Sequence, residues 1–202
     1  MEFSIRGIGI IKEADIKMDG LTVIAGSNNS GKTTVGRALY AVTSAVEDLA
    51  EKQQQDQAKA VFYRIRKIVE PFDGWLSRSR FLSRKEEVSD DLISEVIGIN
   101  HIYNPGKRDY YIDLLFRLCE SMEKGSFIEL LIDNLRDVVG NSESAIRNEW
   151  EDHKEKIQKE CLGAREFVES FQQQTKKEFA YKMIEETLAV EFSNQAQSYI
   201  TV

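Results

Sequence analysis

One short loop near the N-terminus has the clearest potential for chemistry. The residues 26–33 read GSNNSGKT. They match in full the pattern G-x-x-x-x-G-K-[ST], which is typical of loops that bind phosphate groups. Its glycines allow the backbone to bend closely around phosphate oxygens, and successive backbone N–H groups can form an anion-binding nest. The residues that we expect to contact the phosphates are Gly26, Asn28, Asn29, Ser30, Gly31, Lys32, Thr33 and Thr34.

The side chains at the end of this loop predict ATP with Mg²⁺ as the ligand. Lys32 is expected to reach the β- and γ-phosphates and is the candidate catalytic residue. The Thr33 hydroxyl is expected to bind Mg²⁺, and Thr34 to contact the α-phosphate. A helix that begins at about Lys32 would add the positive end of its dipole.

The hydrophobic pattern changes abruptly around the loop. Before it, alternation within 3–10 and 14–18 predicts two strands, and the continuous apolar run Leu21–Ala25 predicts a strand buried on both faces. After it, apolar residues recur at spacings of three and four from Val35 to Leu49, which predicts an amphipathic helix. A buried strand, a glycine-containing loop and a helix in this order are the setting in which phosphate-binding loops work.

Beyond about residue 50 the strand signals nearly vanish and the patterns are helical. We therefore predict an α/β fold, with a β-rich P-loop ATPase lobe at the N-terminus followed by a largely α-helical insertion. The predicted division is 1–50 for the lobe, 51–195 for the helical region and 196–202 for the possible start of a second lobe.

The first 45 residues resemble a known family. The segment Ile5–Ile8, the loop 26–33 and Ala38-Leu39 on the following helix resemble the N-terminal lobe of ABC-type ATPase heads of the SMC, RecF, RecN and OLD group. Asn29 stands where that group usually has a second glycine, and asparagine also accepts a left-handed backbone. The resemblance covers under a quarter of the chain.

This resemblance implies an ATPase in which two heads close around ATP. The implied partners are a second head in a homo-oligomer and a nuclease or other effector subunit, in DNA repair, DNA processing or anti-phage defence. The family also has a Gln that senses Mg²⁺, for which Gln195 is the candidate, with Gln197 as an alternative. The signature, acidic strand end and His switch of the family are not visible, so we expect an incomplete chain with weak or absent ATPase activity.

Two other readings of the loop stay open. A small-molecule P-loop kinase would have a helical lid with arginines, which Arg78, Arg80 and Arg84 could supply, but such kinases also have several later parallel strands. A non-hydrolysing interaction module would dock a partner when ATP is bound. A GTPase is disfavoured because the sequence contains no guanine-reading N-K-x-D motif. Asp133, at the end of Leu130-Leu131-Ile132, is a weak candidate for the acid behind Mg²⁺.

The distribution of charge predicts one possible nucleic-acid contact. The net charge is −7, which disfavours a nucleic-acid-binding surface over the whole protein. The residues 64–85 nevertheless hold seven Lys and Arg side chains against two acidic ones. This stretch is either a solvated helix face or a contact for DNA or RNA.

The composition predicts whether the protein has a membrane partner and where in the cell it is located. No apolar run approaches the roughly 18 residues that a membrane-spanning helix needs, so we expect no membrane partner. The two cysteines, Cys119 and Cys161, form no motif and do not suffice for a disulfide framework, which predicts a reducing, cytoplasmic location.

Overall fold

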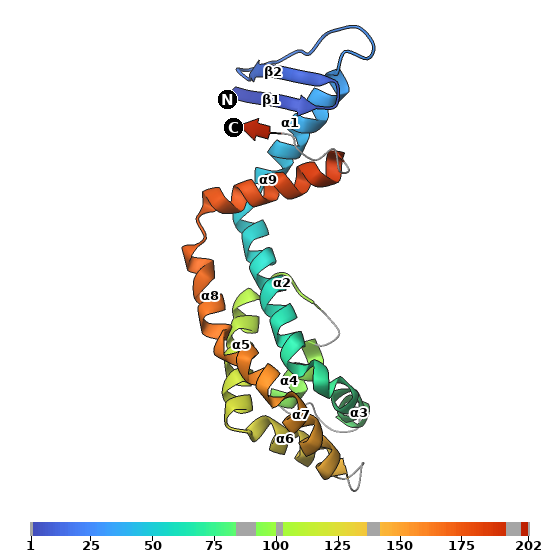
Figure 1. The fold of residues 1–202 in the computed structure, drawn as a ribbon, viewed down its shortest axis with the longest axis vertical. Helices are drawn as coiled ribbons and strands as arrows, with labels where there is room; N and C mark the ends of the chain where they lie inside the picture. Colours follow the sequence, from blue (N-terminus) through green and yellow to red (C-terminus); the bar gives the residue numbers. More distant parts are fainter. Residues whose placement is uncertain (1, 84–91, 100–102, 137–141, 193–198, 202) are drawn as a thin grey trace. The chain divides into compact units, whose positions relative to one another are not determined.

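The computed structural model describes the residues 2–83, 92–99, 103–136, 142–192 and 199–201 (Figure 1). The chain divides into two compact units. Unit 1 comprises Met1–Ala50 and Thr175–Val202, and unit 2 comprises Glu51–Gln174. The residues 176–192, which the sequence analysis placed in the helical region, therefore group with the N-terminal residues.

Unit 1 contains a small antiparallel sheet. The strands β1 (Glu2–Ile8) and β2 (Ile11–Lys17) pair in the register Ile5 opposite Ala14, joined by a two-residue turn at Gly9 and Ile10. The strand β3 (Tyr199–Thr201) pairs with the other edge of β1, so the order is β2-β1-β3. The alternation in the first 18 residues thus predicted two strands correctly.

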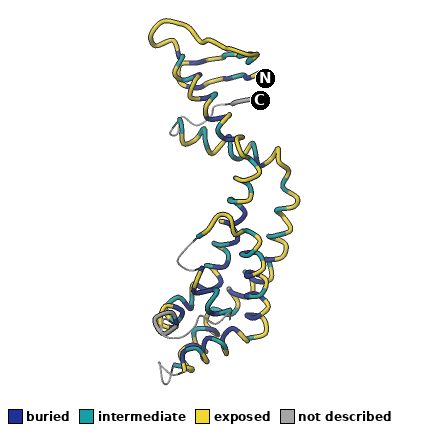
Figure 2. The backbone as a smooth tube through the Cα atoms, turned by 180° about the vertical axis from the view of Figure 1, so that it is seen from behind, coloured by how far each residue is buried: buried dark blue, intermediate teal, exposed yellow. Residues whose placement is uncertain are grey.

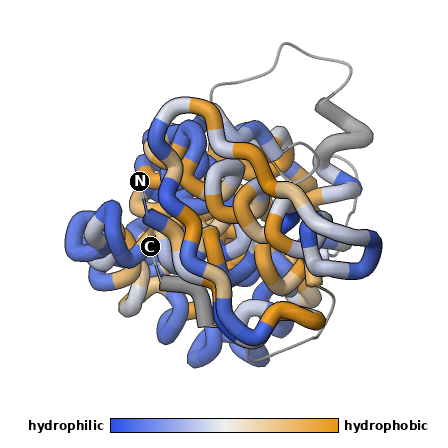
Figure 3. Tube along the Cα trace, turned by 90° about the horizontal axis from the view of Figure 1, so that it is seen from above, coloured by the Kyte–Doolittle hydropathy of each residue, from blue (hydrophilic) through white to orange (hydrophobic). Residues whose placement is uncertain are grey.

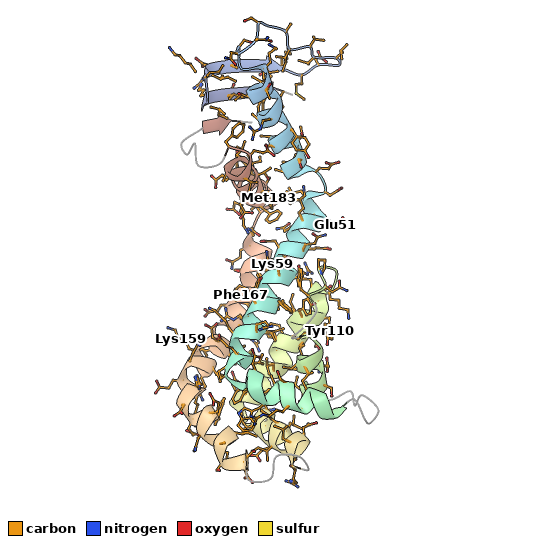
Figure 4. The ribbon with its side chains drawn as sticks, turned by 90° about the vertical axis from the view of Figure 1, so that its right-hand side faces the viewer. Glu51, Lys59, Tyr110, Lys159, Phe167 and Met183 are labelled. Atoms are coloured by element: carbon orange, nitrogen blue, oxygen red, sulfur yellow. The ribbon has the colours of Figure 1, made fainter. Side chains whose placement is uncertain are left out.

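The helices α1 (Lys32–Val46) and α9 (Lys176–Phe192) complete unit 1 and pack against each other. The buried face of α1 is rich in alanine, and small side chains allow the two helix backbones to approach closely. Met183 of α9, labelled in Figure 4, packs against the same core. The buried residues of this core are Phe3, Ile5, Ile8, Ile11, Val35, Ala38, Val42, Ala45 and Ile184.

The predicted α/β fold is wrong: most of the described residues are helical, and their strands form only this antiparallel sheet. The predicted buried strand Leu21–Ala25 is the main error. These residues belong to no strand, and the side chains of Leu21 and Val23 are 91% and 76% exposed; Figure 2 shows the segment between β2 and α1 in yellow. A strand buried on both faces needs paired neighbours and covering layers, and the described residues provide neither for this run.

All the described regular elements of unit 2 are helices. It is built from the part of α2 (Leu49–Val69) that follows Ala50 and from η1 (Glu70–Phe72), α3 (Asp73–Ser83), α4 (Leu92–Ile99), α5 (Arg108–Glu123), α6 (Ser126–Leu135), α7 (Glu143–Leu162) and α8 (Ala164–Gln173). Hydrophobic and hydrophilic stretches alternate along the chain (Figure 3), as amphipathic helices around one core require.

The helix α5 is at the centre of unit 2, because it packs against α4, α6, α7 and α8. Its residues Tyr111, Leu114 and Leu118 are buried in the core of the unit. Phe72 and Phe127 add a tilted aromatic contact with their ring centroids 5.8 Å apart. The predominantly helical character predicted for this part of the chain is confirmed by these elements.

Candidate phosphate-binding site

The loop residues 28–31 and the start of α1 form part of the wall of a cavity of about 700 Å³ in unit 1. The turn between β1 and β2 and the end of α9 contribute the rest of the wall. The lining residues are Gly9, Ile10, Asn28, Asn29, Ser30, Gly31, Lys32, Thr33, Thr34, Arg37, Glu191 and Phe192. The structure therefore brings most of the predicted site residues to one cavity. Gly26 does not line it, but its carbonyl oxygen accepts a hydrogen bond from the Lys32 ammonium at 2.7 Å.

Gly31 immediately precedes α1 and can be replaced by no other residue without strain. Its φ angle is 89°, in the left-handed region that side chains disfavour. A Cβ atom at this position would lie 2.9 Å from Cγ1 of Ile11 in β2, which is closer than carbon atoms pack. The glycine thus allows the loop to pass directly over the sheet before the helix begins.

Asn29 is the second left-handed residue of the loop, with a φ angle of 62°. Asparagine tolerates this conformation better than other side chains do. Asn29 is therefore compatible with the backbone that the loop adopts here.

The start of α1 provides backbone donors at the cavity wall. The helix begins at Lys32, as predicted, and the N–H group of Val35 donates to the carbonyl oxygen of Gly31 at 3.0 Å. The N–H groups that precede this bond have no partner within the helix. They belong to Lys32, Thr33 and Thr34, which all line the cavity, and Gly31 has no side chain to cap them. Donors of this kind at a helix N-terminus attract anions.

The Lys32 ammonium is held by oxygen atoms of its own loop. Its Nζ atom donates to the carbonyl oxygen of Gly26 at 2.7 Å, to that of Ser27, and to the Ser30 hydroxyl at 3.4 Å. In the described part of the chain, no carboxylate pairs with this lysine. The cavity wall therefore carries a positive charge that uncharged oxygens position but do not neutralise.

The sequence analysis missed five residues of the cavity wall, which are Gly9, Ile10, Arg37, Glu191 and Phe192. Arg37 of α1 donates through Nε to a carboxylate oxygen of Glu191 at 3.1 Å and through Nη2 to the carbonyl oxygen of the same residue. Its guanidinium carbon also lies 5.1 Å from the ring centre of Phe192. Arg37 follows Thr33 by one helical turn, a spacing that could have indicated the same helix face. Glu191 and Phe192 gave no signal, because α9 reaches the loop only through the tertiary fold.

The two expected Mg²⁺ ligands that the structure describes, Thr33 and Asp133, belong to different units. Thr33 is exposed on the cavity wall. Both glutamine candidates, Gln195 and Gln197, lie outside the described residues. Asp133 lies in α6 of unit 2 and pairs with Arg136 at 2.7 Å. Within the described ranges, no cluster of three or more His, Cys, Asp or Glu side chains is arranged to hold a metal ion.

The basic stretch 64–85 lies in unit 2, where several of its cations already have partners. Arg64 donates to the carbonyl oxygen of Glu160 at 2.6 Å, and Lys67 lies 3.5 Å from the carboxylate of the same residue. Arg66 lies 3.6 Å from the carboxylate of Asp73. Arg84 and Lys85 lie outside the described residues.

None of the described helices combines the length and the apolar character that a bilayer crossing requires.

Comparisons with known proteins identify no relative of the chain. No protein-family model matches the sequence, and neither a curated protein nor a solved structure matches the chain.

Proposed function

We propose that this protein binds ATP with Mg²⁺ in the cavity of unit 1. One observation carries the proposal: the free N–H groups at the start of α1, the Lys32 ammonium and the hydroxyls of Thr33 and Thr34 line the same open cavity. Together they offer several hydrogen-bond donors and a positive charge, which is the chemistry that a triphosphate requires.

In the proposed complex each group has a separate role. The Lys32 ammonium leaves the carbonyl oxygens of Gly26 and Ser27 and binds the β- and γ-phosphates, whose negative charge the uncharged carbonyl oxygens lack. The Thr33 hydroxyl binds the Mg²⁺ ion, and Thr34 contacts the α-phosphate. Phe192 and Ile10, at the edges of the cavity, provide apolar surface for the nucleoside.

The proposal does not include hydrolysis by this chain alone. Among the described lining residues, Glu191 is the one carboxylate, and it is engaged by Arg37. Water activation would need a further group, so we propose weak or absent ATPase activity. The resemblance to SMC-type heads supports a second head that completes the site in a homo-oligomer, with a nuclease or other effector as partner in DNA repair or anti-phage defence.

A second candidate is a nucleotide-dependent interaction module that does not hydrolyse ATP. The contact between Arg37 and the end of α9 favours it, because a phosphate that binds Arg37 would replace Glu191 and release this end of the helix. For either function we propose the cytoplasm as the location, since both cysteines are free thiols in the structure.

Isothermal titration calorimetry with ATP·Mg²⁺ and GTP·Mg²⁺ tests the proposal. We expect ATP binding by the wild type and a Kd about ten- to a hundredfold weaker in Lys32→Ala, since a hydrogen bond to a charged group contributes about 1.5–3 kcal/mol. Lys12→Ala is the matched control, because it removes one positive charge from β2 without touching the cavity. Equal ATP binding by Lys32→Ala and the wild type would contradict the proposal.

A further inference from the structure

The two cysteines of the chain meet in the core of unit 2. Cys119 lies in α5 and Cys161 lies near the C-terminal end of α7. Both are free thiols, only 6% and 5% exposed, and both belong to the same buried core of unit 2. The packing of α5 against α7 therefore places side by side two thiols that are far apart in the sequence.

The two thiols have opposite acid–base character. The neighbouring Cys119 thiol lowers the pKa of the Cys161 thiol, because it favours the thiolate, and the positive charge of Arg64 acts in the same direction against burial and the charge of Glu123. The neighbouring Cys161 and burial raise the pKa of the Cys119 thiol. Cys161 is thus the better nucleophile, and Cys119 retains its proton.

Arg64 is fixed beside this pair. Its Nε and Nη2 atoms donate to the carbonyl oxygen of Glu160 at 3.2 and 2.6 Å, and its guanidinium carbon lies 4.8 Å from the ring centre of Phe167. Phe167, labelled in Figure 4, comes from α8. A Cβ atom on Gly163 would lie 2.8 Å from Nη2 of Arg64, so the glycine after α7 makes room for the guanidinium.

A cavity of about 440 Å³ gives small molecules access to the thiols, because both cysteines line it. The charged lining residues are Glu120, Glu123, Glu166 and Arg165. Three carboxylates against one cation disfavour an anionic thiol reagent such as glutathione and leave access to a small neutral oxidant.

We propose that Cys119 and Cys161 are a modification site, at which hydrogen peroxide converts the two thiols into a reversible intramolecular disulfide. The proposal is independent of nucleotide binding in unit 1. It rests on the burial of both thiols in the packed helices α5 and α7, their common cavity and the guanidinium beside them.

The reaction balances with peroxide as the oxidant. The Cys161 thiolate attacks one oxygen of hydrogen peroxide, the O–O bond breaks, and the leaving hydroxide takes up a proton to form water. The Cys161 sulfur, now a sulfenic acid, has given up two electrons. The Cys119 sulfur then attacks it and loses its proton, the S–O bond breaks, and a second water leaves. A dithiol reductant returns both residues to thiols.

The disulfide would join α5 to the end of α7 and close a loop of about 40 residues. A cross-link of this kind restricts the unfolded chain, so we expect the melting temperature to rise by about 5–10 °C on oxidation. Because Cys161 is two residues before the junction of α7 and α8 at Gly163, the bond would also fix this junction to α5.

Mass spectrometry of the folded chain treated with hydrogen peroxide tests the proposal. We expect a monomer that has lost two hydrogen atoms, a cross-linked peptide that contains both cysteines, and full reversal by dithiothreitol. The single variants Cys119→Ser and Cys161→Ser should not lose the two hydrogens. Cys119→Ser should instead form a sulfenic acid at Cys161 that dimedone traps, and faster than Cys161→Ser does at Cys119.

The chain unfolded in urea is the reference for intrinsic thiol reactivity. An unchanged mass of the folded chain, at a peroxide concentration that oxidises the unfolded chain, would overturn the proposal. So would oxidation that yields only disulfide-linked dimers or sulfinic acid. These outcomes do not depend on any variant, so a variant that fails to fold leaves the test intact.

Discussion

The Lys32 ammonium of unit 1 and two arginines of unit 2 have different kinds of hydrogen-bond partner. In unit 1 the Lys32 ammonium bonds to carbonyl and hydroxyl oxygens, which carry no net charge. In unit 2 Arg117 donates to both carboxylate oxygens of Glu95 at 2.7 Å, and Arg147 donates to both of Glu129 at 2.8 and 3.0 Å. These bidentate contacts raise the pKa of both arginines.

This difference indicates where an added anion would bind. A phosphate that approaches Arg117 or Arg147 must displace a carboxylate with ideal bidentate geometry. A phosphate that approaches Lys32 displaces only neutral oxygens, and it gains the N–H groups at the start of α1 as well. The account therefore predicts that phosphate binding is a property of unit 1, whereas the cations of unit 2 stabilise the helical fold.

The largest expected effect is that of Gly31→Ala. The left-handed backbone costs an alanine about 1–2 kcal/mol, and the new Cβ atom would have to displace Ile11. We expect ATP·Mg²⁺ binding at least tenfold weaker than wild type, measured by calorimetry. Gly36→Ala in the same helix is the control, since open space surrounds that position and alanine favours the helix. Equal losses in both variants would show that the effect is not specific to the loop.

Glu95→Gln should have a smaller effect, and on stability alone. It removes the charge that pairs with Arg117, but solvent screens this half-exposed pair, so we expect a loss of about 1 kcal/mol in the free energy of unfolding. Urea denaturation would measure it, with Glu151→Gln at a surface pair as the control. ATP affinity should not change. A loss of ATP binding in Glu95→Gln would contradict the prediction that phosphate binding is a property of unit 1.

Glu191→Gln should strengthen ATP binding by about two- to fivefold, which corresponds to about 0.4–1 kcal/mol. The change removes a negative charge from the cavity and weakens the hold on Arg37, so the guanidinium becomes available to a phosphate. Glu185→Gln, on the exposed surface of the same helix, makes the same change in net charge outside the cavity. If both variants bind ATP equally well, general electrostatics accounts for the gain and Arg37 has no part in it.

The smallest expected effect is a pH dependence of unit 2. The hydrogen bond from Arg147 lowers the pKa of Glu129 below its ordinary value of 4.5. A carboxylate with a depressed pKa stabilises the fold above its unfolded pKa and loses this contribution as the pH falls through its folded pKa. The melting temperature of wild type minus that of Glu129→Gln should therefore be constant from pH 7 to about pH 5 and should shrink below about pH 4.5. A difference that grows on acidification would contradict the assignment.

The parts of the fold that depend on local signals were predictable from the sequence. The glycines, Asn29 and the periodicity after Val35 indicated a left-handed loop and a helix start at Lys32, and both are present. The alternation of Phe3 and Ile5 likewise indicated a strand with one buried face. Each of these features depends on residues within a few positions of one another.

The features that depend on distant partners were not predictable in the same way. The run Leu21–Ala25 has the composition of a buried strand, but composition does not reveal whether a neighbouring strand exists to pair with it. The contact between Arg37 and Glu191 joins residues from helices far apart in the sequence. The cavity that Cys119 and Cys161 share does the same. No local sequence pattern predicts such pairs.

The most direct test of the central claim is an NMR titration of the ¹⁵N-labelled chain with ATP·Mg²⁺. The account predicts that the largest amide shifts occur in the residues 26–37 and near Glu191, and that Lys32→Ala suppresses them. The largest shifts in the basic stretch 64–85, or no shifts at ATP concentrations that saturate P-loop proteins, would contradict it.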